Sequence, residues 1–501
     1  MSEAPASGGV AYRSAAGRWV LLATVLGSGM AFLDATVVNI ALPAIGEEFD
    51  AGLAGLQWTV NAYTLTLAGL LLLGGALGDR FGRRRVFLWG VAWFAVASLL
   101  CTVAPTIETL IIGRGLQGVG GAMLTPGSLA IIEASFRKAD RPVAIGAWSG
   151  LAGAATALGP FLGGWLIESV SWRLIFLINV PIGAVVFWVG ARHVPESRDE
   201  AARGRPLDWW GAALTALGLA GVIYALTAGP GSGWDAPTVA IGAAGVVALL
   251  AFVVIESRIA DPLVDLGLFG SRQFTAANLV TFVVYGALGG GLFLLPIQLQ
   301  ISLDYTPIAA GSALIPLTLV MLLLSARAGR LSGRIGPRLP MTVGPVVAGG
   351  GLALLAGVSA GDDYLTAILP GILVFALGLS LTVAPLTATV LAAASEERAG
   401  VASAVNNSVA RVAGLLAVAV IPVVVGLSGD SYQDPAALTD GYRSALLIAA
   451  VLCVIGGLLS AATIRNSGEP VAETPPCCPI DAPPLGAEEM ESPVPVARAG
   501  G

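Results

Sequence analysis

Charged residues are scarce in this sequence. Only 12% of the 501 residues are Asp, Glu, Lys or Arg, and 56% are hydrophobic, whereas an ordinary soluble domain carries about 25% charged residues. A soluble chain of this composition could not hide its apolar surface from water. The net charge of −6 and the scattered basic residues also lack the positive face that nucleic-acid binding needs. The composition indicates a membrane protein and excludes nucleic acid as a partner.

Histidine and cysteine are almost absent. The single histidine, His193, lies in a charged loop, and the cysteines are Cys101 and Cys453 in apolar runs and Cys477 and Cys478 near the C-terminus. These positions form neither a disulfide framework nor a set of zinc ligands. The sequence also has no P-loop, no G-x-S-x-G elbow and no HExxH motif. We therefore expect no metal site, no cofactor, no enzyme activity and no ATP-driven pumping by this chain.

Long apolar runs are what the sequence has in abundance. A bilayer core about 30 Å thick is crossed by about 20 residues of helix, and fourteen such runs occur along the chain. Their approximate bounds are 19–41, 56–77, 86–104, 107–133, 142–167, 173–191, 207–229, 238–256, 275–299, 308–327, 339–358, 366–394, 400–427 and 443–464. The sequence predicts an all-α membrane protein with fourteen transmembrane helices.

Basic residues mark one set of loops. If the N-terminus is cytoplasmic, the arginine clusters within 80–85, 192–205 and 327–338 fall on the inner side, and the outer loops hold only Arg173 and Arg443 as basic residues. This asymmetry follows the positive-inside rule. An even number of spans then places both termini in the cytoplasm, and the plasma membrane is the predicted location.

An internal repeat divides the chain into two halves. The segment "GALGDRFGRRR" from Gly75 superposes on "GRLSGRIGPRL" from Gly329 after a shift of 254 residues, and repeat-built membrane proteins are mostly transporters. The Pro- and Glu-rich C-terminal segment has no apolar periodicity, so we expect it to be disordered. The predicted organisation is a cytoplasmic N-terminus (1–18), a six-helix half (19–191), a linker (192–206), two inserted helices (207–256), a linker (257–274), a six-helix half (275–464) and a disordered cytoplasmic tail (465–501).

Four segments resemble motifs of the major facilitator superfamily. "GALGDRFGRRR" is similar to its cytoplasmic motif A, "LDATVVNIALPAI" to motif D1, "RGLQGVGGAML" to motif B, and "GAATALGPFLGGWL" to motif C, which marks antiporters. With fourteen spans, this set resembles the drug:proton antiporter subgroup of multidrug exporters over residues 15–465. The resemblance implies the major facilitator fold, with two six-helix halves plus two inserted helices, and a proton gradient as the energy source.

Two charged residues, Asp34 and Arg114, lie well inside predicted spans of the first half. An ionised carboxylate at Asp34 would cost about 2.5–3.5 kcal/mol in a membrane, so we expect it to be neutral, paired or hydrated. The resemblance to motif D1 implies that Asp34 carries the transported proton; a permanent hydrogen bond to Thr36, Asn39 or another helix is the structural alternative. Arg114 keeps its proton, and the resemblance to motif B implicates it in proton transfer, with a clamp on backbone carbonyls as the alternative.

Two further motifs have a physical basis as well as a resemblance. Motif A combines turn glycines with one acidic residue and several arginines. We expect it to act as a cytoplasmic gate, the alternative being that its arginines only fix the topology. Its residues are Gly78, Asp79, Arg80, Gly82, Arg83 and Arg84. The glycine-rich fifth span is expected to form a close, pivoting helix contact, ordinary small-residue packing being the alternative; its residues are Gly153, Gly159, Pro160, Gly163 and Gly164.

Several polar and aromatic residues in the spans are candidates for lining the substrate cavity. They are Asn39, Trp58, Tyr63, Gln117, Tyr285, Asn406, Asn407 and Arg411. Helix–helix hydrogen bonding explains the residues of the thirteenth span about as well, and aromatic residues are more often packing or interface anchors. With Asp34 as the main membrane acid, neutral or singly charged lipophiles are the favoured substrates.

The sequence predicts a proton-coupled antiporter that exports small lipophilic compounds, such as drugs, across the plasma membrane by alternating access. Its partners are the substrate, protons and membrane lipid, and a monomer is expected because the two halves enclose their own pathway. Two alternatives remain open: an exporter of one endogenous metabolite, and a facilitator or importer of the same fold.

Overall fold

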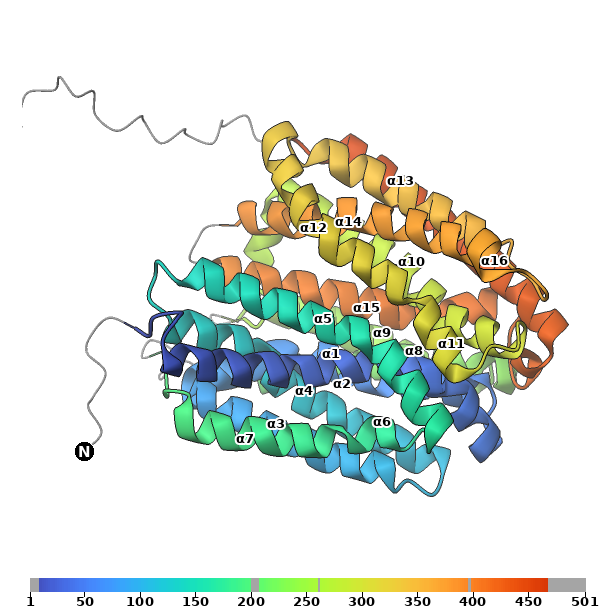
Figure 1. Ribbon diagram of the computed structural model, residues 1–501, viewed down its shortest axis with the longest axis horizontal. Helices are drawn as coiled ribbons and strands as arrows, with labels where there is room; N and C mark the ends of the chain where they lie inside the picture. The colour runs from blue at the N-terminus through green and yellow to red at the C-terminus, as the bar shows by residue number, and fades with distance from the viewer. Residues whose placement is uncertain (1–8, 200–206, 260–261, 395–397, 467–501) are drawn as a thin grey trace, which may run out of the picture. The chain divides into compact units, whose positions relative to one another are not determined.

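A computed structural model describes residues 9–199, 207–259, 262–394 and 398–466. These residues are almost entirely helical (Figure 1), and a single isolated β-bridge joins Val10 to Phe136 within them. Residues 467–501 of the predicted disordered tail, and parts of the predicted N-terminus and linkers, lie outside the described residues. Every predicted apolar run overlaps a helix or two consecutive helical segments, and the runs 339–358 and 400–427 extend past helices that end at Leu355 and Val424.

The helices follow the chain in antiparallel succession. The first set is α1 (Ala15–Phe49), α2 (Leu53–Phe81), α3 (Arg83–Thr102), α4 (Ile107–Ser135), α5 (Arg141–Ser169), α6 (Leu174–Leu177) and α7 (Asn179–His193). The second set is α8 (Trp209–Ser232) and α9 (Ala236–Glu256), followed by the 3-10 turn η2 (Leu266–Gly270). The third set is α10 (Arg272–Ile301), α11 (Pro307–Ala313), α12 (Ile315–Ile335), α13 (Arg338–Leu355), the π turn η3 (Tyr364–Ile368), α14 (Leu369–Ala392), α15 (Ala399–Val424), η5 (Ser431–Gln433) and α16 (Pro435–Thr463).

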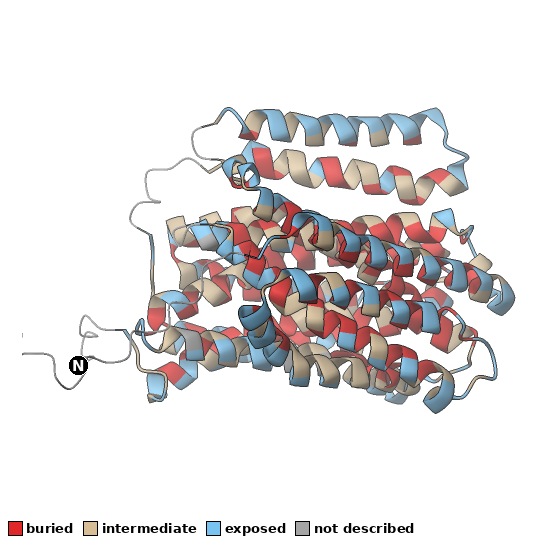
Figure 2. Cartoon of the chain, turned by 90° about the horizontal axis from the view of Figure 1, so that it is seen from above, coloured by how far each residue is buried: buried red, intermediate tan, exposed pale blue. Residues whose placement is uncertain are grey.

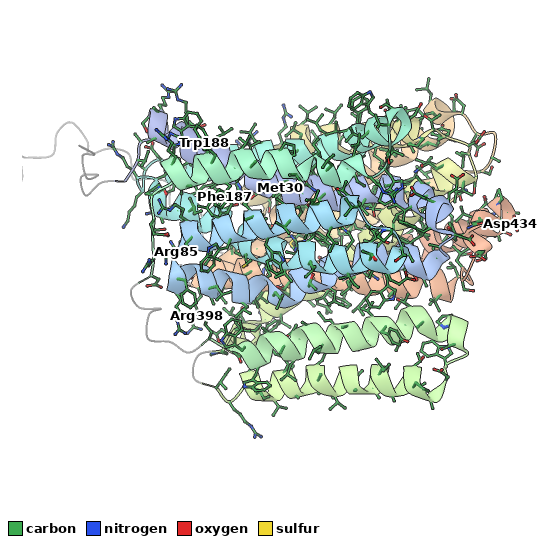
Figure 3. All side chains as sticks on the ribbon, turned by 90° about the horizontal axis from the view of Figure 1, so that it is seen from below. Met30, Arg85, Phe187, Trp188, Arg398 and Asp434 are labelled. Atoms are coloured by element: carbon green, nitrogen blue, oxygen red, sulfur yellow. The ribbon has the colours of Figure 1, made fainter. Side chains whose placement is uncertain are left out.

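The two ends of this bundle differ in what they carry. We call the end where α1 begins and α16 finishes the terminal end, and the opposite end, with the turn at 50–52, the far end. Figure 3 shows Asp434 at the far end and Arg85 and Arg398 toward the terminal end. Because successive helices alternate in direction, the end to which a residue belongs follows from its place in its helix.

Two predicted spans are each divided between two helices. Pro181 has no amide hydrogen to bond the carbonyl of Leu177, four residues earlier, and α6 ends at Leu177 while α7 begins at Asn179. Pro316 removes the equivalent bond to Ser312, close to the point where α11 gives way to α12. Proline therefore accounts for both interruptions.

The number of membrane-spanning helices is shown only in part. Among the described residues, twelve helical segments are long and apolar enough to cross a membrane. The 29-residue helices α4 and α5 are not among them; in α4, Arg114, Gln117 and several glycines lower the hydropathy. The structure thus shows an all-helical membrane protein, and the two remaining spans stay predictions.

The inserted helices lie at the edge of the bundle. In Figure 3, α8 and α9 run side by side in pale green, apart from the other helices on one side. An apolar cluster joins α8 to α2 and α15; its residues are Leu65, Leu219, Ile223, Leu415 and Ala419. In α9, by contrast, only 11% of the apolar 18-residue stretch is buried inside the protein. Figure 2 shows an outermost helix in which the exposed colour predominates. The composition of α9 fits a lipid-facing helix.

The internal repeat places two glycines in equivalent turns. Gly82, between α2 and α3, has φ +114°, and Gly336, between α12 and α13, has φ +85°. Residues other than glycine rarely adopt these positive φ angles, so both turns require glycine. The two copies of the repeat therefore share a local backbone feature.

Candidate functional site

A fully buried ion pair lies in the first part of the chain. Asp34, on α1, has no exposed surface, and Arg114, on α4, is 1% exposed. Nη1 of Arg114 lies 2.5 Å from Oδ2 of Asp34. Two opposite charges removed from water stabilise each other only when their remaining hydrogen-bonding groups are also satisfied. The surrounding residues provide those partners.

Oδ1 of Asp34 accepts two more hydrogen bonds. Nδ2 of Asn179, the first residue of α7, donates over 3.1 Å, and Nε2 of Gln117 donates over 3.2 Å. Gln117 also accepts from Nη1 of Arg114 over 2.7 Å and donates to Oγ of Ser98 over 2.7 Å. The carboxylate of Asp34 therefore has three hydrogen-bond donors, which supports its ionised form.

Arg114 is held from two other sides. Its Nε donates to the carbonyl oxygen of Thr59 over 3.0 Å. The guanidinium carbon lies 4.5 Å from the centre of the Tyr63 ring and 5.7 Å from that of Phe176, within the range of cation–π attraction. Residues of α1, α2, α4 and α6 thus converge on this one guanidinium, and Asn179 of α7 reaches the site through Asp34.

The chemistry available to this pair is limited by its composition. The guanidinium of Arg114 does not lose its proton, so Asp34 is the member that can change protonation state. A proton on Asp34 would remove the attraction to Arg114 and leave the arginine with Gln117 and the Thr59 carbonyl. A change of one proton would therefore alter the contacts among five helices.

The partners of Asp34 differ from those that the sequence suggested. Thr36 donates to the carbonyls of Phe32 and Leu33 in its own helix, and Asn39 makes no hydrogen bond to the acid. Sequence reasoning missed Asn179, Ser98 and the Thr59 carbonyl. For Asn179 a signal existed, because it is the one amide side chain in the run 173–191.

The candidate cavity residues fall into separate places. Gln117 and Tyr63 belong to the Asp34 site. Trp58 packs against the cluster between α2, α8 and α15. The side-chain amide of Asn406 donates to Asn278 and Thr281 of α10 over 3.1 and 2.7 Å, which is helix–helix hydrogen bonding.

The remaining candidates make few polar contacts. Asn407 is exposed and donates to the carbonyl of Ser403 in its own helix. Oδ1 of Asn39 and Nε of Arg411 are buried without a hydrogen-bond partner among the described residues. Tyr285 packs partly buried against the apolar cluster of α10, α13, α14 and α15, and Arg411 lies within electrostatic range of Tyr285 and Tyr63.

The motif A residues surround the turn from α2 to α3 at the terminal end. Gly78, Asp79 and Arg80 end α2, Gly82 forms the turn, and Arg83 and Arg84 begin α3. Arg83 pairs with Asp79 over 2.8 Å. Nη1 of Arg84 donates to the carbonyl of Val194 over 3.1 Å, and its backbone amide donates to Glu196 over 3.1 Å. These contacts tie the motif to the segment after α7.

The glycines of α5 lie against two other helices. A Cβ atom on Gly163 would lie 2.7 Å from Cγ2 of Val37 on α1, and one on Gly159 would meet Oγ1 of Thr36. A Cβ atom on Gly164 would lie 2.7 Å from Cα of Ile308 on α11, and one on Gly311 of α11 would meet the carbonyl of Pro160. For Gly153 the structure places only the backbone, within α5.

Hydrogen bonds join α1–α7 to the segments from α10 onward in the far half of the bundle. Nε2 of Gln57 donates to the carbonyl of Val418 over 2.7 Å, and the hydroxyl of Tyr432 donates to the carbonyl of Ala51 over 2.8 Å. Further bonds are Gln300 to the Ile40 carbonyl at 3.0 Å, the Leu53 amide to the Gly429 carbonyl at 2.9 Å, and the Ile308 amide to Glu168 at 3.2 Å. The far end is closed by these contacts.

Comparison with known sequences identifies the protein family of this chain. The model of the Major Facilitator Superfamily matches residues 24–418. The chain is 35% identical over 407 residues to the multidrug resistance protein Stp of Mycobacterium tuberculosis, covering 81% of this chain and 75% of that protein. It is 35% identical over 469 residues to the puromycin resistance protein pur8 of Streptomyces alboniger, covering 91% and 93%.

Solved structures agree on the fold. A bacterial homologue of the human lysosomal transporter Spinster, in an inward-facing and unoccupied conformation, has a TM-score of 0.65 at 16% identity, covering 90% of this chain and 97% of that one. A POT family transporter in complex with a thioalcohol-conjugated peptide has a TM-score of 0.66 at 12% identity, covering 88% and 94%. The sequence match shows that the chain belongs to the Major Facilitator Superfamily, and that it is a multi-pass membrane transporter and not an enzyme.

Proposed function

We propose that this protein is a proton-coupled antiporter that exports small lipophilic compounds across the plasma membrane by alternating access, with Asp34 as the proton carrier. The observation that carries the proposal is the buried Asp34–Arg114 ion pair. Relatives named for multidrug resistance and for puromycin resistance support export of drug-like molecules. A further relative is named as a tetracenomycin C resistance and export protein, which supports the direction.

The ion pair supports proton coupling for an electrostatic reason. A buried carboxylate with a cation and two amide donors is stable as an anion in this arrangement. Opening the site to water on the outer side would let a proton compete with Arg114 for Asp34. Since the contacts of the acid come from two other helices, α4 and α7, proton uptake would favour a different packing of α1, α4 and α7.

The contacts between the two parts of the chain support alternating access. The far end is closed by backbone and side-chain hydrogen bonds and by the close contact of α5 with α11. With the termini in the cytoplasm, as the arginine distribution predicts, this is an inward-facing arrangement. Opening toward the outside then requires the glycine contact between Gly164 and α11 to separate.

Motif A is proposed to act at the opposite step. In this arrangement Asp79 pairs with Arg83, within the first part of the chain. When the cytoplasmic end closes, Asp79 and the neighbouring arginines would face the second half and could hold it there. The second copy of the repeat has Gly333 in place of the acid, so such a latch would depend on the first copy alone.

The number of spans and the substrate contacts are proposed from the sequence. Fourteen spans require α4 and α5 to cross the membrane with the other twelve, and their 29 residues are long enough. Asn39, Tyr285 and Arg411 are proposed to line the substrate path, because Asn39 and Arg411 each carry a buried polar atom without a hydrogen-bond partner among the described residues. A monomer is sufficient for this mechanism.

Transport in proteoliposomes tests the proposal. Purified wild-type protein should move a fluorescent lipophilic dye against its gradient when a pH gradient is imposed, and the movement should stop when an ionophore collapses that gradient. Asp34→Asn should give only the leak of protein-free liposomes. Glu47→Gln is the matched control, since Glu47 is an exposed acid on the same helix, and it should transport like wild type.

The alternatives give different results in the same assay. A facilitator would equilibrate the dye without a pH gradient, and an importer would accumulate it in the opposite direction. Equal coupled transport by wild type and Asp34→Asn would reject Asp34 as the proton carrier. An exporter of one metabolite would move none of a panel of unrelated dyes.

A further inference from the structure

Two acidic residues meet at the terminal end of the inserted helices, away from the Asp34 site. Asp208 is the residue immediately before α8, and Glu256 is the last residue of α9. Glu256 is only 2% exposed. Neither residue has a role in the antiport mechanism proposed above.

Each carboxyl group has one oxygen that is satisfied and one that is not. Oδ1 of Asp208 accepts from the amide of Gly211 over 2.8 Å and so caps α8. Oε2 of Glu256 accepts from the amide of Val264 over 3.3 Å. Oδ2 of Asp208 and Oε1 of Glu256 are buried, and neither has a hydrogen-bond partner among the described residues.

The two unsatisfied oxygens point to the same place. A Cβ atom on Gly211 would lie 2.8 Å from Oε1 of Glu256 and even closer to Oδ2 of Asp208. The absence of a side chain at Gly211 therefore lets the two carboxyl groups approach each other over its Cα. The two groups interact electrostatically.

Two ionised carboxylates cannot be stable in this position. Both would be removed from water, and they would repel each other, so one of them is favoured in its protonated form. A single proton would turn one carboxyl into a donor and satisfy both unpaired oxygens. Proton sharing between neighbouring carboxyl groups is the usual solution to this problem.

The charged groups on the neighbouring elements do not supply a substitute cation within the described residues. Helix α8 packs on α2, α9 and α15. At this end α2 carries Asp79 and Arg80, and α15 begins after Arg398, which pairs with Asp265 over 3.0 Å. The linker after α9 carries Arg258, which is exposed. Asp208 is a carboxyl group that acts electrostatically on Glu256.

We propose that Asp208 and Glu256 form a second proton-binding site, in which one shared proton joins the start of α8 to the end of α9. The proposal does not depend on the transport function. Its consequence reaches beyond the inserted helices, because Glu256 also holds the amide of Val264, and the following residue, Asp265, pairs with Arg398 before α15. The shared proton therefore fixes the linker that leads into the second half.

Thermal unfolding of the full-length protein in detergent, measured against pH, tests this site. The folded state holds a proton that the two separated acids of the unfolded state do not hold near neutral pH, so wild-type stability should fall as pH rises. Glu256→Gln donates a hydrogen bond without a proton to lose, and its unfolding midpoint should lack this fall of a few degrees. Asp208→Asn should also lack it, and asparagine keeps the helix cap.

Asp235→Asn is the matched control. Asp235 caps α9 by accepting from the amide of Thr238 over 3.0 Å, and it lies at the exposed far end of the same helix pair. This variant should keep the wild-type dependence on pH. An unfolding midpoint of Glu256→Gln that falls with pH as steeply as that of wild type would overturn the proposal.

A direct readout separates a proton from other ligands. The infrared spectrum of an Asp34→Asn protein should contain the carbonyl stretch of a protonated carboxyl, and the band should disappear when Glu256→Gln is added. Stabilisation of wild type, but not of Glu256→Gln, by millimolar Mg²⁺ or Na⁺ at alkaline pH would show a metal cation in place of the proton. That result would also overturn the proposal.

Discussion

The side-chain amide of Asn179 donates a hydrogen bond to Oδ1 of Asp34 over 3.1 Å, from the first residue of α7. Asn179 lies at the junction of α6 and α7, two residues before Pro181. The hydrogen bond therefore ties this junction to the acid on α1.

Removing this donor should weaken the site without removing its charges. For Asn179→Leu we expect a loss of about 1.5–3 kcal/mol, the usual value of a hydrogen bond to a charged group, and slower coupled transport. Thermal unfolding and dye transport measure the two effects. Asn61→Leu is the control, because Asn61 is a buried asparagine on α2 whose side chain has no hydrogen-bond partner among the described residues. Equal effects of both substitutions would contradict the role assigned to Asn179.

The buried ion pair should be more sensitive to the loss of one charge than to the loss of both. Arg114→Gln leaves Asp34 buried without its cation, which should cost about 3–5 kcal/mol of stability. Adding Asp34→Asn should restore most of that stability while transport stays absent. Unfolding midpoints of the single and double variants form the measurement. Destabilisation by the double variant equal to the sum of the two single effects would show that the residues are not coupled.

The contact between α5 and α11 should be sensitive to one added methyl group. In Gly164→Ala, the new Cβ would collide with the backbone of Pro307 and Ile308, so closure of the far end should become less favourable. Labelling of a cysteine placed near the far end should then become faster, and transport slower. Gly150→Ala is the control on the same helix, since nothing lies within 4 Å of a Cβ there; a comparable effect from this variant would contradict the proposed contact.

Removing a single hydroxyl group at the far end should also shift the equilibrium between the closed and open states of that end. The hydroxyl of Tyr432 donates to the carbonyl of Ala51 over 2.8 Å, and burial raises the pKa of Tyr432, so it remains a donor at physiological pH. Tyr432→Phe should destabilise the closed far end by about 0.5–1.5 kcal/mol. The buried hydroxyl of Tyr442 has no hydrogen-bond partner among the described residues.

The matched substitution Tyr442→Phe is therefore expected to leave the balance unchanged. Double electron–electron resonance between spin labels on the two halves would report the population of each state. A larger population of the open far end in Tyr432→Phe alone is the expected outcome. The same change in both variants would indicate a general loss of packing.

The sequence by itself determined that this chain forms membrane helices and where they lie. A bilayer admits a polar backbone only when it is hydrogen-bonded within the segment, so long apolar runs leave little choice of secondary structure. The motifs around Asp34, Asp79 and Pro160 also predicted the family, which the comparisons confirmed. Of the fourteen predicted spans, twelve correspond to described helices that are long and apolar enough to cross a membrane.

Only the tertiary structure decided which polar groups meet. The contacts of Asp34 with Asn179 and Arg114, and of Asp208 with Glu256, join residues 48–145 positions apart in the chain. Apolar periodicity is weak in helices surrounded by lipid and by other helices, so it does not fix the rotation of each helix about its axis. That rotation is set by close packing at small residues such as Gly163 and Gly218, whose neighbours lie on other helices. The chemistry of both sites follows from it.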